Sequence, residues 1–533
     1  MSTETIQNLI EYYISLHSRK SPKAFEELVL RGSSEIPSLI AILEGPAIDD
    51  YHLTESQYVS LKILAALGEI AIDPLLKLLA QKNQRPHFDG ICDALITIGP
   101  SCINKVEGLL YDERFALVRV LAGIANYEAV KILGQIVVCN EHFDDYARIK
   151  AAETLAEMDN DEALQSISWL ISDPLPGIRI HAARALGKLR DRFYVDQLIS
   201  GLLNQEGKSR EMEEIRINSA WALGQIGDHK AVPALLEFIA NRSQYLSPWE
   251  GEFALILRTS ALESVIKALG KLEDRSAVEP LIDLLKDKNL KSELCIAACQ
   301  TLGTLKDQSA LPILTELAVD GVEDVRGAAV EAIGDIGDPW CIDSIYDALE
   351  DPSAFVRKEA VIALGKLGTG DDVDVLIDIL KDGDEDDYIK KEVCSAILKI
   401  GTDSIAAITE DYIKNYEYNN GSSYMNSKYW IPILKKIGDD SLKPFLKLLE
   451  KPRDHSSEWL MAVSALGALG FPAAVNPLCK CFFNEQEDLS IKEEIRLAIR
   501  SIVYESLQAL YCSKKEVVDG VVDELLKVFE SHH

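Results

Sequence analysis

The sequence predicts an all-α protein, an α-solenoid of about 13 stacked helix pairs with a helical cap at each end. Two observations predict this fold: one helical phrase recurs at a nearly constant interval, and a second apolar helical segment follows most copies. The phrase VRKEAVIALGKLG at residues 356–368 repeats VRGAAVEAIGDIG at residues 325–337. Such a short unit cannot bury its own apolar face, so neighbouring units must stack to form one continuous core.

The copies align on the first glycine of the pattern A-[LI]-G-x-[LI], which we call the anchor. Close copies have their anchors at Gly187, Gly224, Gly270, Gly303, Gly334, Gly365 and Gly467, and looser copies at Gly68, Ile96, Ala122, Ala156, Leu398 and Lys435. Most neighbouring anchors are 26 to 37 residues apart, and many are 31 to 33 residues apart. This interval matches one pair of helices with two short turns.

The apolar residues of one copy predict the first helix of each pair. Val356, Ala360, Ala363, Leu364 and Leu367 lie at i, i+4, i+7, i+8 and i+11, which is one stripe of a helix. The anchor glycine allows a neighbouring helix to approach closely. A second glycine at the end of the phrase is expected to adopt the left-handed conformation that ends a helix. It stands at Gly227, Gly337 and Gly368.

Proline marks the first turn of the second helix, where its missing N–H costs no hydrogen bond. Pro74, Pro280, Pro444 and Pro477 share one repeat position, and Pro233 and Pro312 stand one residue earlier. Asp228, Asp307 and Asp338 follow directly after first helices and are predicted to cap the second ones.

A column of basic residues stands eight positions before the anchor. Its members are Arg114, Arg148, Arg179, Arg216, Arg326, Arg357 and Lys390. An acidic residue such as Asp324 or Asp351 often precedes them closely. We interpret the column as a structural ladder, in which each cation binds a carboxylate or a helix-terminal carbonyl of the neighbouring repeat. An anion-binding site is the alternative.

These columns together resemble the HEAT-repeat superfamily, specifically its short PBS-lyase HEAT-like variety. Residues 324–351, DVRGAAVEAIGDIGDPWCIDSIYDALED, fit the consensus VRxxAxxALGxLGDxxAVxxLxxLLxD nearly throughout. The resemblance implies a right-handed superhelix, with the first helices on the convex face and the second helices on the concave face. It predicts a fold strongly and a function only weakly, because such arrays serve as scaffolds and adaptors and, in a few families, as enzymes.

Three regions are predicted along the chain. An N-terminal helical cap covers residues 1–54, the repeat array covers residues 55–480, and a C-terminal helical cap covers residues 481–533.

The charge balance restricts the class of partner. The net charge of −31, from 55 basic and 86 acidic residues, repels phosphate-rich partners, so nucleic acid is disfavoured. Ten scattered cysteines without a CxxC pattern indicate free thiols in a reducing compartment. The start MSTETIQNLIEYY does not resemble a secretion signal, and no apolar run is long enough to insert into a membrane. We therefore expect a cytoplasmic protein.

Catalytic signatures are missing from the sequence. None of the nine histidines precedes a glutamate, which argues against the di-iron hydroxylases built from the same repeat. Phosphate-binding, nucleophile-elbow and zinc motifs are absent as well. The acidic run DGDEDD at 382–387 lacks the residue order of a calcium loop and is interpreted as a solvated turn. No metal and no cofactor are predicted.

Two insertions interrupt the period, near residues 241–253 and 411–430. Their aromatic residues, Tyr245, Trp249, Tyr416, Tyr418, Tyr424 and Trp430, are candidates for partner binding, because tyrosine and tryptophan are enriched at interface centres. The alternative, weighted equally, is that they fill gaps where the stacking is interrupted. Trp221 stands off the buried stripe and is expected to be covered, with the first insertion as the predicted cover.

The sequence favours a non-catalytic scaffold, adaptor or assembly factor that binds proteins along an acidic curved surface. Electrostatic steering favours partners with basic patches. The runner-up is a bilin lyase or a tetrapyrrole-handling chaperone acting on phycobiliproteins, since bilin lyases are built from this repeat type.

Overall fold

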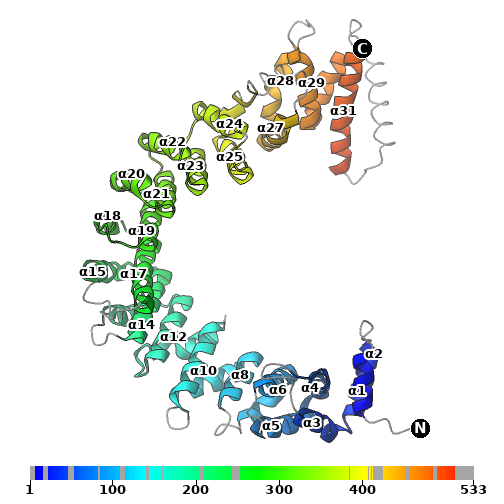
Figure 1. Ribbon diagram of the computed structural model, residues 1–533, viewed down its shortest axis with the longest axis vertical. Coiled ribbons are helices and arrows are strands. Elements are labelled where there is room, and N and C mark those ends of the chain that lie inside the picture. Colours follow the sequence, from blue (N-terminus) through cyan, green and yellow to red (C-terminus); the bar gives the residue numbers. More distant parts are fainter. Residues whose placement is uncertain are drawn as a thin grey trace. The chain divides into compact units, whose positions relative to one another are not determined.

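The chain is described by a computed structural model. The described residues are 6–15, 22–45, 53–81, 85–107, 114–139, 143–158, 160–204, 209–242, 252–382, 384–405, 407–409, 411, 424–450, 457–483 and 489–509. Throughout these ranges every regular element is a helix (Figure 1). The all-α stacked-hairpin fold is therefore confirmed, and the count of 13 pairs stays a prediction.

The chain divides into two compact units, residues 1–280 and residues 281–533. Unit 1 begins with α1 (Ile6–Ser15), α2 (Pro22–Gly32) and α3 (Ile36–Glu44). Its first helices are α4 (Glu55–Leu67), α6 (Arg85–Ile98), α8 (Arg114–Ile124), α10 (Asp145–Glu157), α12 (Pro176–Leu189), α14 (Arg210–Ile226) and α17 (Glu252–Leu272). Its second helices are α5 (Ile72–Gln81), α7 (Ile103–Glu107), α9 (Tyr127–Val138), α11 (Asp161–Ser168), α13 (Val195–Leu203) and α15 (Val232–Ala240).

Helix α18 (Val278–Leu285) contains the boundary between the units. In unit 2 the first helices are α19 (Ser292–Leu305), α21 (Glu323–Ile336), α23 (Ala354–Leu367), α25 (Asp387–Ile400), α27 (Tyr424–Ile437) and α29 (Ser457–Leu469). The second helices that follow are α20 (Leu311–Asp320), α22 (Ile342–Leu349), α24 (Val373–Lys381), α28 (Leu442–Leu449) and α30 (Val475–Phe482), and α31 (Leu489–Ala509) comes last among the described helices.

The anchor glycines bring consecutive first helices into backbone contact, as predicted. A Cβ atom on Gly365 would lie 2.7 Å from the Cα atom of Ala396 in the next first helix, well inside van der Waals contact. The same close approach pairs Gly224 with Ala268, Gly303 with Ala332, Gly334 with Ala363, and Gly467 with Ala498. At Gly187 the ring of Trp221 also packs against the glycine, and Trp221 is half-buried, while most of the insertion predicted to cover it lies outside the described residues.

This close approach decides which layer faces inward in unit 2. Helices α19, α21, α23 and α25 contact one another along much of their length, whereas α20 and α22 meet at few positions. Helices that pack closely lie on the inside of a curve, and helices that splay apart lie on the outside. Figure 1 accordingly shows the first helices of unit 2 on the inner side and the second helices on the outer side. The expectation of convex first helices and concave second helices is wrong for this unit.

The turns between paired helices follow the sequence with one exception. The carboxylates of Asp228, Asp307 and Asp338 accept hydrogen bonds from backbone N–H groups two residues later, and they cap one-turn 3₁₀ segments that lead into the second helices. Gly227 and Gly337 are left-handed, with φ of 71° and 80°. Gly368 instead has a φ of −68°, because a capping box between Thr369 and Asp372 organises that turn. The left-handed assignment of Gly368 is therefore wrong.

Candidate protein-binding surface

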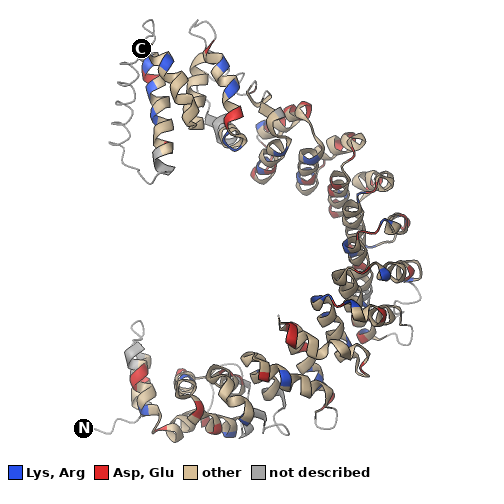
Figure 2. Cartoon of the chain, turned by 180° about the vertical axis from the view of Figure 1, so that it is seen from behind, with Lys and Arg blue, Asp and Glu red and all other residues tan. Residues whose placement is uncertain are grey.

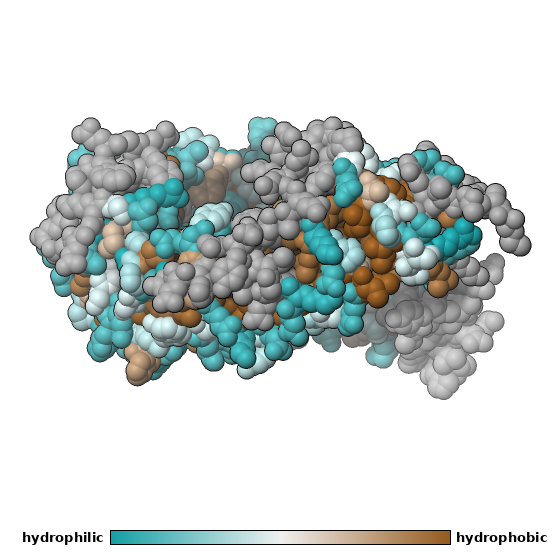
Figure 3. Space-filling model, turned by 90° about the horizontal axis from the view of Figure 1, so that it is seen from below, coloured by the Kyte–Doolittle hydropathy of each residue, from teal (hydrophilic) through white to brown (hydrophobic). Residues whose placement is uncertain are grey.

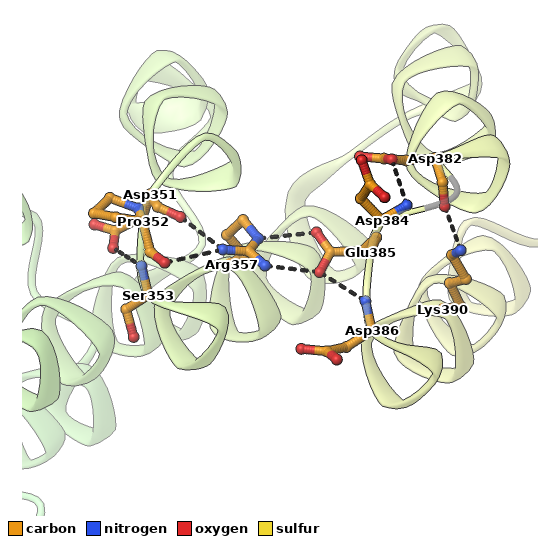
Figure 4. A network of polar contacts seen from close by, with 9 residues as sticks. All are labelled: Asp351, Pro352, Ser353, Arg357, Asp382, Asp384, Glu385, Asp386 and Lys390. Carbon is orange, nitrogen blue, oxygen red and sulfur yellow. Dashed lines mark hydrogen bonds and ion pairs between the residues drawn. The ribbon is translucent and has the colours of Figure 1, made fainter.

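The best-formed part of the basic column joins three repeats of unit 2, and Figure 4 shows the portion in which Arg357 binds Asp351 and Glu385. Arg326 donates from Nε and one terminal nitrogen to the two carboxylate oxygens of Asp351, both at 2.8 Å. Arg357 makes the same two-pronged contact with Glu385, at 2.9 and 2.8 Å, and donates to the backbone carbonyl of Asp351 at 2.9 Å. Asp351 therefore accepts hydrogen bonds from Arg326 through its carboxylate and from Arg357 through its backbone carbonyl.

The other described members bind turn carbonyls in a similar way. Arg148 donates to the Val137 carbonyl at 2.8 Å and pairs with Asp173. Arg179 donates to the Asp173 carbonyl at 2.7 Å, Arg216 donates to the Asn204 carbonyl at 2.6 Å, and Lys390 donates to the Asp382 carbonyl. The side chain of Arg114 lies outside the described residues.

These contacts engage each described member of the basic column with groups of the protein itself. Hydrogen bonds from the guanidinium groups lower the pKa of the Asp351 and Glu385 carboxyls, which keeps both partners charged. A guanidinium held by a carboxylate and a backbone carbonyl has little capacity left for an external anion. The geometry supports the structural ladder over the anion site.

The predicted aromatic clamp falls largely outside what the structure describes. Tyr245, Trp249, Tyr416 and Tyr418 lie in residues outside the described ranges, and the side chain of Tyr424 at the start of α27 is likewise not described. Trp430 is the exception, because its side chain on α27 is only 2% exposed. A side chain so deeply buried cannot anchor a partner, so Trp430 fills the core, as the alternative interpretation had it.

A different feature of unit 2 offers a continuous exposed surface. Four consecutive second helices, α18, α20, α22 and α24, present a carboxylate at the same repeat position, and all four residues are exposed. These residues are Asp283, Glu316, Asp347 and Asp378, and we call them the second-helix carboxylates. Figure 2 shows the distribution of acidic and basic residues along the helices.

Neighbouring cations compensate these carboxylates only in part. Lys286 pairs with Asp283 at 2.8 Å, but Lys381 lies 4.0 Å from Asp378 and closer to Asp411. Across the described parts of the chain, neither Glu316 nor Asp347 forms an ion pair. Exposed like charges repeated on neighbouring helices add up to a negative potential that attracts cations.

The inner face of the same repeats differs, because its charges are paired with one another. Lys366 contacts Asp335 at 2.6 Å and Lys358 contacts Glu359 at 2.7 Å. Lys358 also lies over the ring of Phe355, 5.2 Å from its centroid. Much of this inner charge is therefore already satisfied within the protein, which favours the outer carboxylates as the binding surface.

An exposed tryptophan stands at the edge of the second-helix carboxylates. Trp340 is 92% exposed and lies in the capped turn before α22, where its backbone N–H donates to Asp338. Asp343 and Asp347 lie four residues apart on α22 and so share one face of that helix, and Trp340 stands directly before its start. Tryptophan is enriched at the energetic centres of interfaces.

Sequence reasoning missed this surface although the signal is present. Each second-helix carboxylate stands 13 residues after an anchor glycine, from Gly270 to Gly365. Aligning this column as carefully as the basic one would have found it. The exposure of Trp340 carries no such periodic signal.

Metal sites and membrane spans receive no support from the described residues. They contain no group of three or more histidine, cysteine or acidic residues placed to hold a metal ion. None of their helices has the length and apolar character needed to cross a membrane. The surface seen in Figure 3 is mainly hydrophilic, with apolar residues between the hydrophilic ones.

Family models identify the repeat. A model of HEAT repeats matches residues 136–212, 167–246, 260–326 and 320–397, and a model of the PBS lyase HEAT-like repeat matches residues 460–484. Together these matches cover about half of the chain. The chain belongs to the HEAT-repeat superfamily. No curated protein matches its sequence.

Solved structures share the fold at low sequence identity. Importin beta, crystallised in an ammonium sulfate condition, is 12% identical with a TM-score of 0.52, and the match covers 94% of this chain and 77% of importin beta. A chain of the Kap95:Nup1 complex is 13% identical with a TM-score of 0.55, covering 96% and 78%. The complex of CpcE and CpcF of phycocyanin lyase from Nostoc sp. PCC7120 is 20% identical with a TM-score of 0.27, covering 62% and 94%.

Proposed function

We propose that this protein is a non-catalytic cytoplasmic scaffold, adaptor or assembly factor, and that it binds proteins with basic segments on the second-helix carboxylates. The observation that carries this proposal is the run of exposed, incompletely paired carboxylates on α18, α20, α22 and α24, with Trp340 at its edge. The net charge of −31 supports a basic partner. The shared fold with importin beta and with a chain of the Kap95:Nup1 complex supports a protein partner.

The spacing of the carboxylates suggests the form of the partner. Packed helices lie about 8–10 Å apart, and an extended chain advances about 3.3 Å per residue. The second helices splay apart on the outer side, so their spacing is at least this large, and an extended segment needs basic residues at least three positions apart to match one cation to each repeat. An apolar residue beside the basic run would contact Trp340.

The free cysteines support the cytoplasmic location. None of the nine cysteines among the described residues is joined to another of them in a disulfide, and burial raises the pKa of the Cys299 thiol to about 12. Buried thiols of this kind are typical of proteins kept in a reducing compartment.

The experiment compares two sets of charge-removing substitutions. The test variant carries Asp283→Asn, Glu316→Gln, Asp347→Asn and Asp378→Asn. The matched control removes four exposed carboxylates from first helices of the same unit, through Glu293→Gln, Glu323→Gln, Asp324→Asn and Asp387→Asn. The probe is a labelled 15-residue peptide with lysine at every third position and one phenylalanine, measured by fluorescence anisotropy.

We expect the test variant to weaken peptide binding about tenfold or more, since exposed charge pairs contribute about 0.2–1 kcal/mol each. The control variant has the same net charge and should bind nearly as the parent does. Equal losses in the two variants would mean that only the net charge of the molecule attracts the peptide, and the proposed surface would then be abandoned.

A bilin lyase or tetrapyrrole-handling chaperone is the second candidate. The match of the PBS lyase HEAT-like repeat at residues 460–484 is the observation that favours it. Coexpression of the chain with a bilin and an apo-phycobiliprotein tests it, because attachment of the pigment would give the acceptor visible absorbance. A colourless acceptor would remove this candidate.

A further inference from the structure

A cavity of about 400 Å³ lies in unit 1 between helices α2, α4 and α6. Phe25 of α2 forms one wall, Tyr58 and Lys62 of α4 stand at another, and Leu61, Ala66 and Ala94 contribute apolar surface. Cavities that bind small molecules have volumes of about 300–1,000 Å³ and are mostly apolar with a few polar groups. The size and the lining of this cavity fit that class.

The cavity exists because small residues occupy facing positions on two first helices. Ala65 and Ala66 of α4 face Gly90 and Ala94 of α6 around the space. At Gly90 the helices approach closely, since a Cβ atom there would lie 2.6 Å from Leu61. Among the described residues, Leu53 and Leu61 lie against Gly90, while alanines line much of the adjacent space. The apolar surface is thus available to a ligand without rearrangement of the helices.

One charged group of the cavity remains available, namely the ammonium group of Lys62. It lies over the ring of Tyr58, 4.5 Å from the ring centroid, and it is exposed. The polar groups on the opposite wall are already engaged. Asp93 accepts a hydrogen bond of 3.0 Å from Arg119, and the hydroxyl of Thr97 donates to the Asp93 carbonyl at 2.8 Å. Lys62 is therefore the cationic side chain of this lining, while the carboxylate of Asp93 on the opposite wall is held by Arg119.

We propose that this cavity binds an amphipathic organic carboxylate, with its apolar body against Phe25, Leu61 and the alanines and its carboxylate on Lys62. Transfer of the hydrocarbon from water onto the apolar walls supplies most of the affinity. The ion pair with Lys62 orients the ligand and selects an acid over an uncharged analogue. Positively charged amphiphiles are excluded, because they would place a cation beside Lys62.

The test uses two fluorescent probes that differ only in charge: 11-(dansylamino)undecanoate and the corresponding primary amide. Their emission is titrated against the full chain at low ionic strength. Lys62→Met removes the charge but keeps the length of the side chain, and Ala66→Trp fills the cavity from an exposed position. Lys77→Met on α5 is the matched control, since Lys77 is exposed and does not line the cavity.

We expect Lys62→Met to weaken binding of the undecanoate about two- to fivefold and to leave binding of the amide unchanged. Ala66→Trp should abolish binding of both probes, and Lys77→Met should change neither. Circular dichroism of each variant checks that the helices are retained. The proposal is overturned if the parent chain does not bind the undecanoate, if Ala66→Trp leaves its binding unchanged, or if Lys62→Met weakens both probes equally.

Discussion

Arg326 and Asp351 form a two-pronged ion pair that joins one repeat to the next, with both N···O distances at 2.8 Å and both side chains largely buried. The pair lies between the start of α21 and the turn before α23. Because Asp351 also accepts from Arg357 through its backbone, the position of one turn depends on two arginines. Contacts of this kind add polar connections to the apolar packing between neighbouring repeats.

Replacement of Arg326 by lysine should loosen this connection although the charge is kept. Lysine cannot make the planar two-pronged contact, so we expect a loss of about 1–2 kcal/mol of local stability. Hydrogen exchange of the amides in α21 and α23 measures it. Glu263→Gln breaks an exposed pair with Lys267 and should cost less than about 0.5 kcal/mol. Equal protection of these amides from exchange in the parent and in Arg326→Lys would show that the two-pronged geometry of the contact does not contribute to stability.

The contribution of Asp351 should depend on pH in a defined direction. Its pKa in the folded protein is lowered from 3.8, mainly by the hydrogen bond from Arg326. A carboxyl with a lowered pKa stabilises the fold above its ordinary pKa, and this stabilisation is lost as the pH falls through the folded value. The difference in unfolding free energy between the parent and Asp351→Asn should therefore be constant at neutral pH and shrink below pH 3.8. Urea titrations at several pH values test it, and a constant difference would contradict it.

Glu331 should behave in the opposite way. Burial, together with the nearby carboxylates Glu359 and Asp335, raises the pKa of Glu331, so its ionised form opposes folding at neutral pH. Glu331→Gln should stabilise unit 2 at neutral pH. The gain should vanish as the pH falls and the parent side chain takes up a proton. Urea unfolding at neutral and acidic pH measures the difference, and a variant that is less stable than the parent at neutral pH would show that the charge is needed.

Substitution of an anchor glycine should reverse the usual effect of alanine in a helix. Alanine normally stabilises a helix interior by about 0.5–1 kcal/mol relative to glycine. At Gly365 the added methyl group would meet the backbone of Ala396, so we expect a loss of about 1–3 kcal/mol. Gly134 in α9 is the control, because its nearest contact would be an ordinary 3.5 Å to Ser166. Thermal unfolding should show opposite shifts for the two variants, and shifts of the same sign would exclude the packing explanation.

Substitution of Trp430 is expected to lower the stability of the fold, whereas substitution of Trp340 is expected to affect binding. Trp430 is buried, so Trp430→Ala should cost about 3–5 kcal/mol of stability. Trp340 is exposed, so Trp340→Ala should change stability by less than about 0.5 kcal/mol. On the proposed function, it should also weaken binding of the basic peptide that contains phenylalanine. Differential scanning calorimetry and fluorescence anisotropy measure the two effects, and a stable Trp430→Ala chain would contradict the core position.

The repeat could be predicted from sequence because each of its columns has a local physical cause. The anchor glycine at Gly365, the cap at Asp338 and the proline at Pro312 depend on contacts that recur every repeat. Gly368 was misassigned because its turn is set by Thr369 and Asp372, a pair that other copies lack. The repeat pattern predicts a left-handed glycine at this position, but the capping box formed by Thr369 and Asp372 gives the turn a different backbone conformation.

The candidate surface was less accessible to sequence reasoning for two reasons. The exposure of a residue such as Trp340 depends on how the neighbouring repeat packs beside it. The periodicity of the sequence carries no information about that packing. Trp430 is buried although it lies in an insertion. The repeat pattern is interrupted near residues 411–430, so the pattern does not predict which face of the helix Trp430 occupies. The sequence pattern does not predict which layer lies on the inner side of unit 2, because curvature depends on the relative spacing of the two layers.

The shared use of Asp351 by Arg326 and Arg357 has a mechanical consequence. A tilt of one repeat in this part of unit 2 must displace the turn that holds the next arginine, and Glu385 passes the displacement on through its contact with Arg357. Bending is thereby distributed over successive hairpins, so this stretch should respond to a load as an elastic rod rather than as a string of loosely jointed beads.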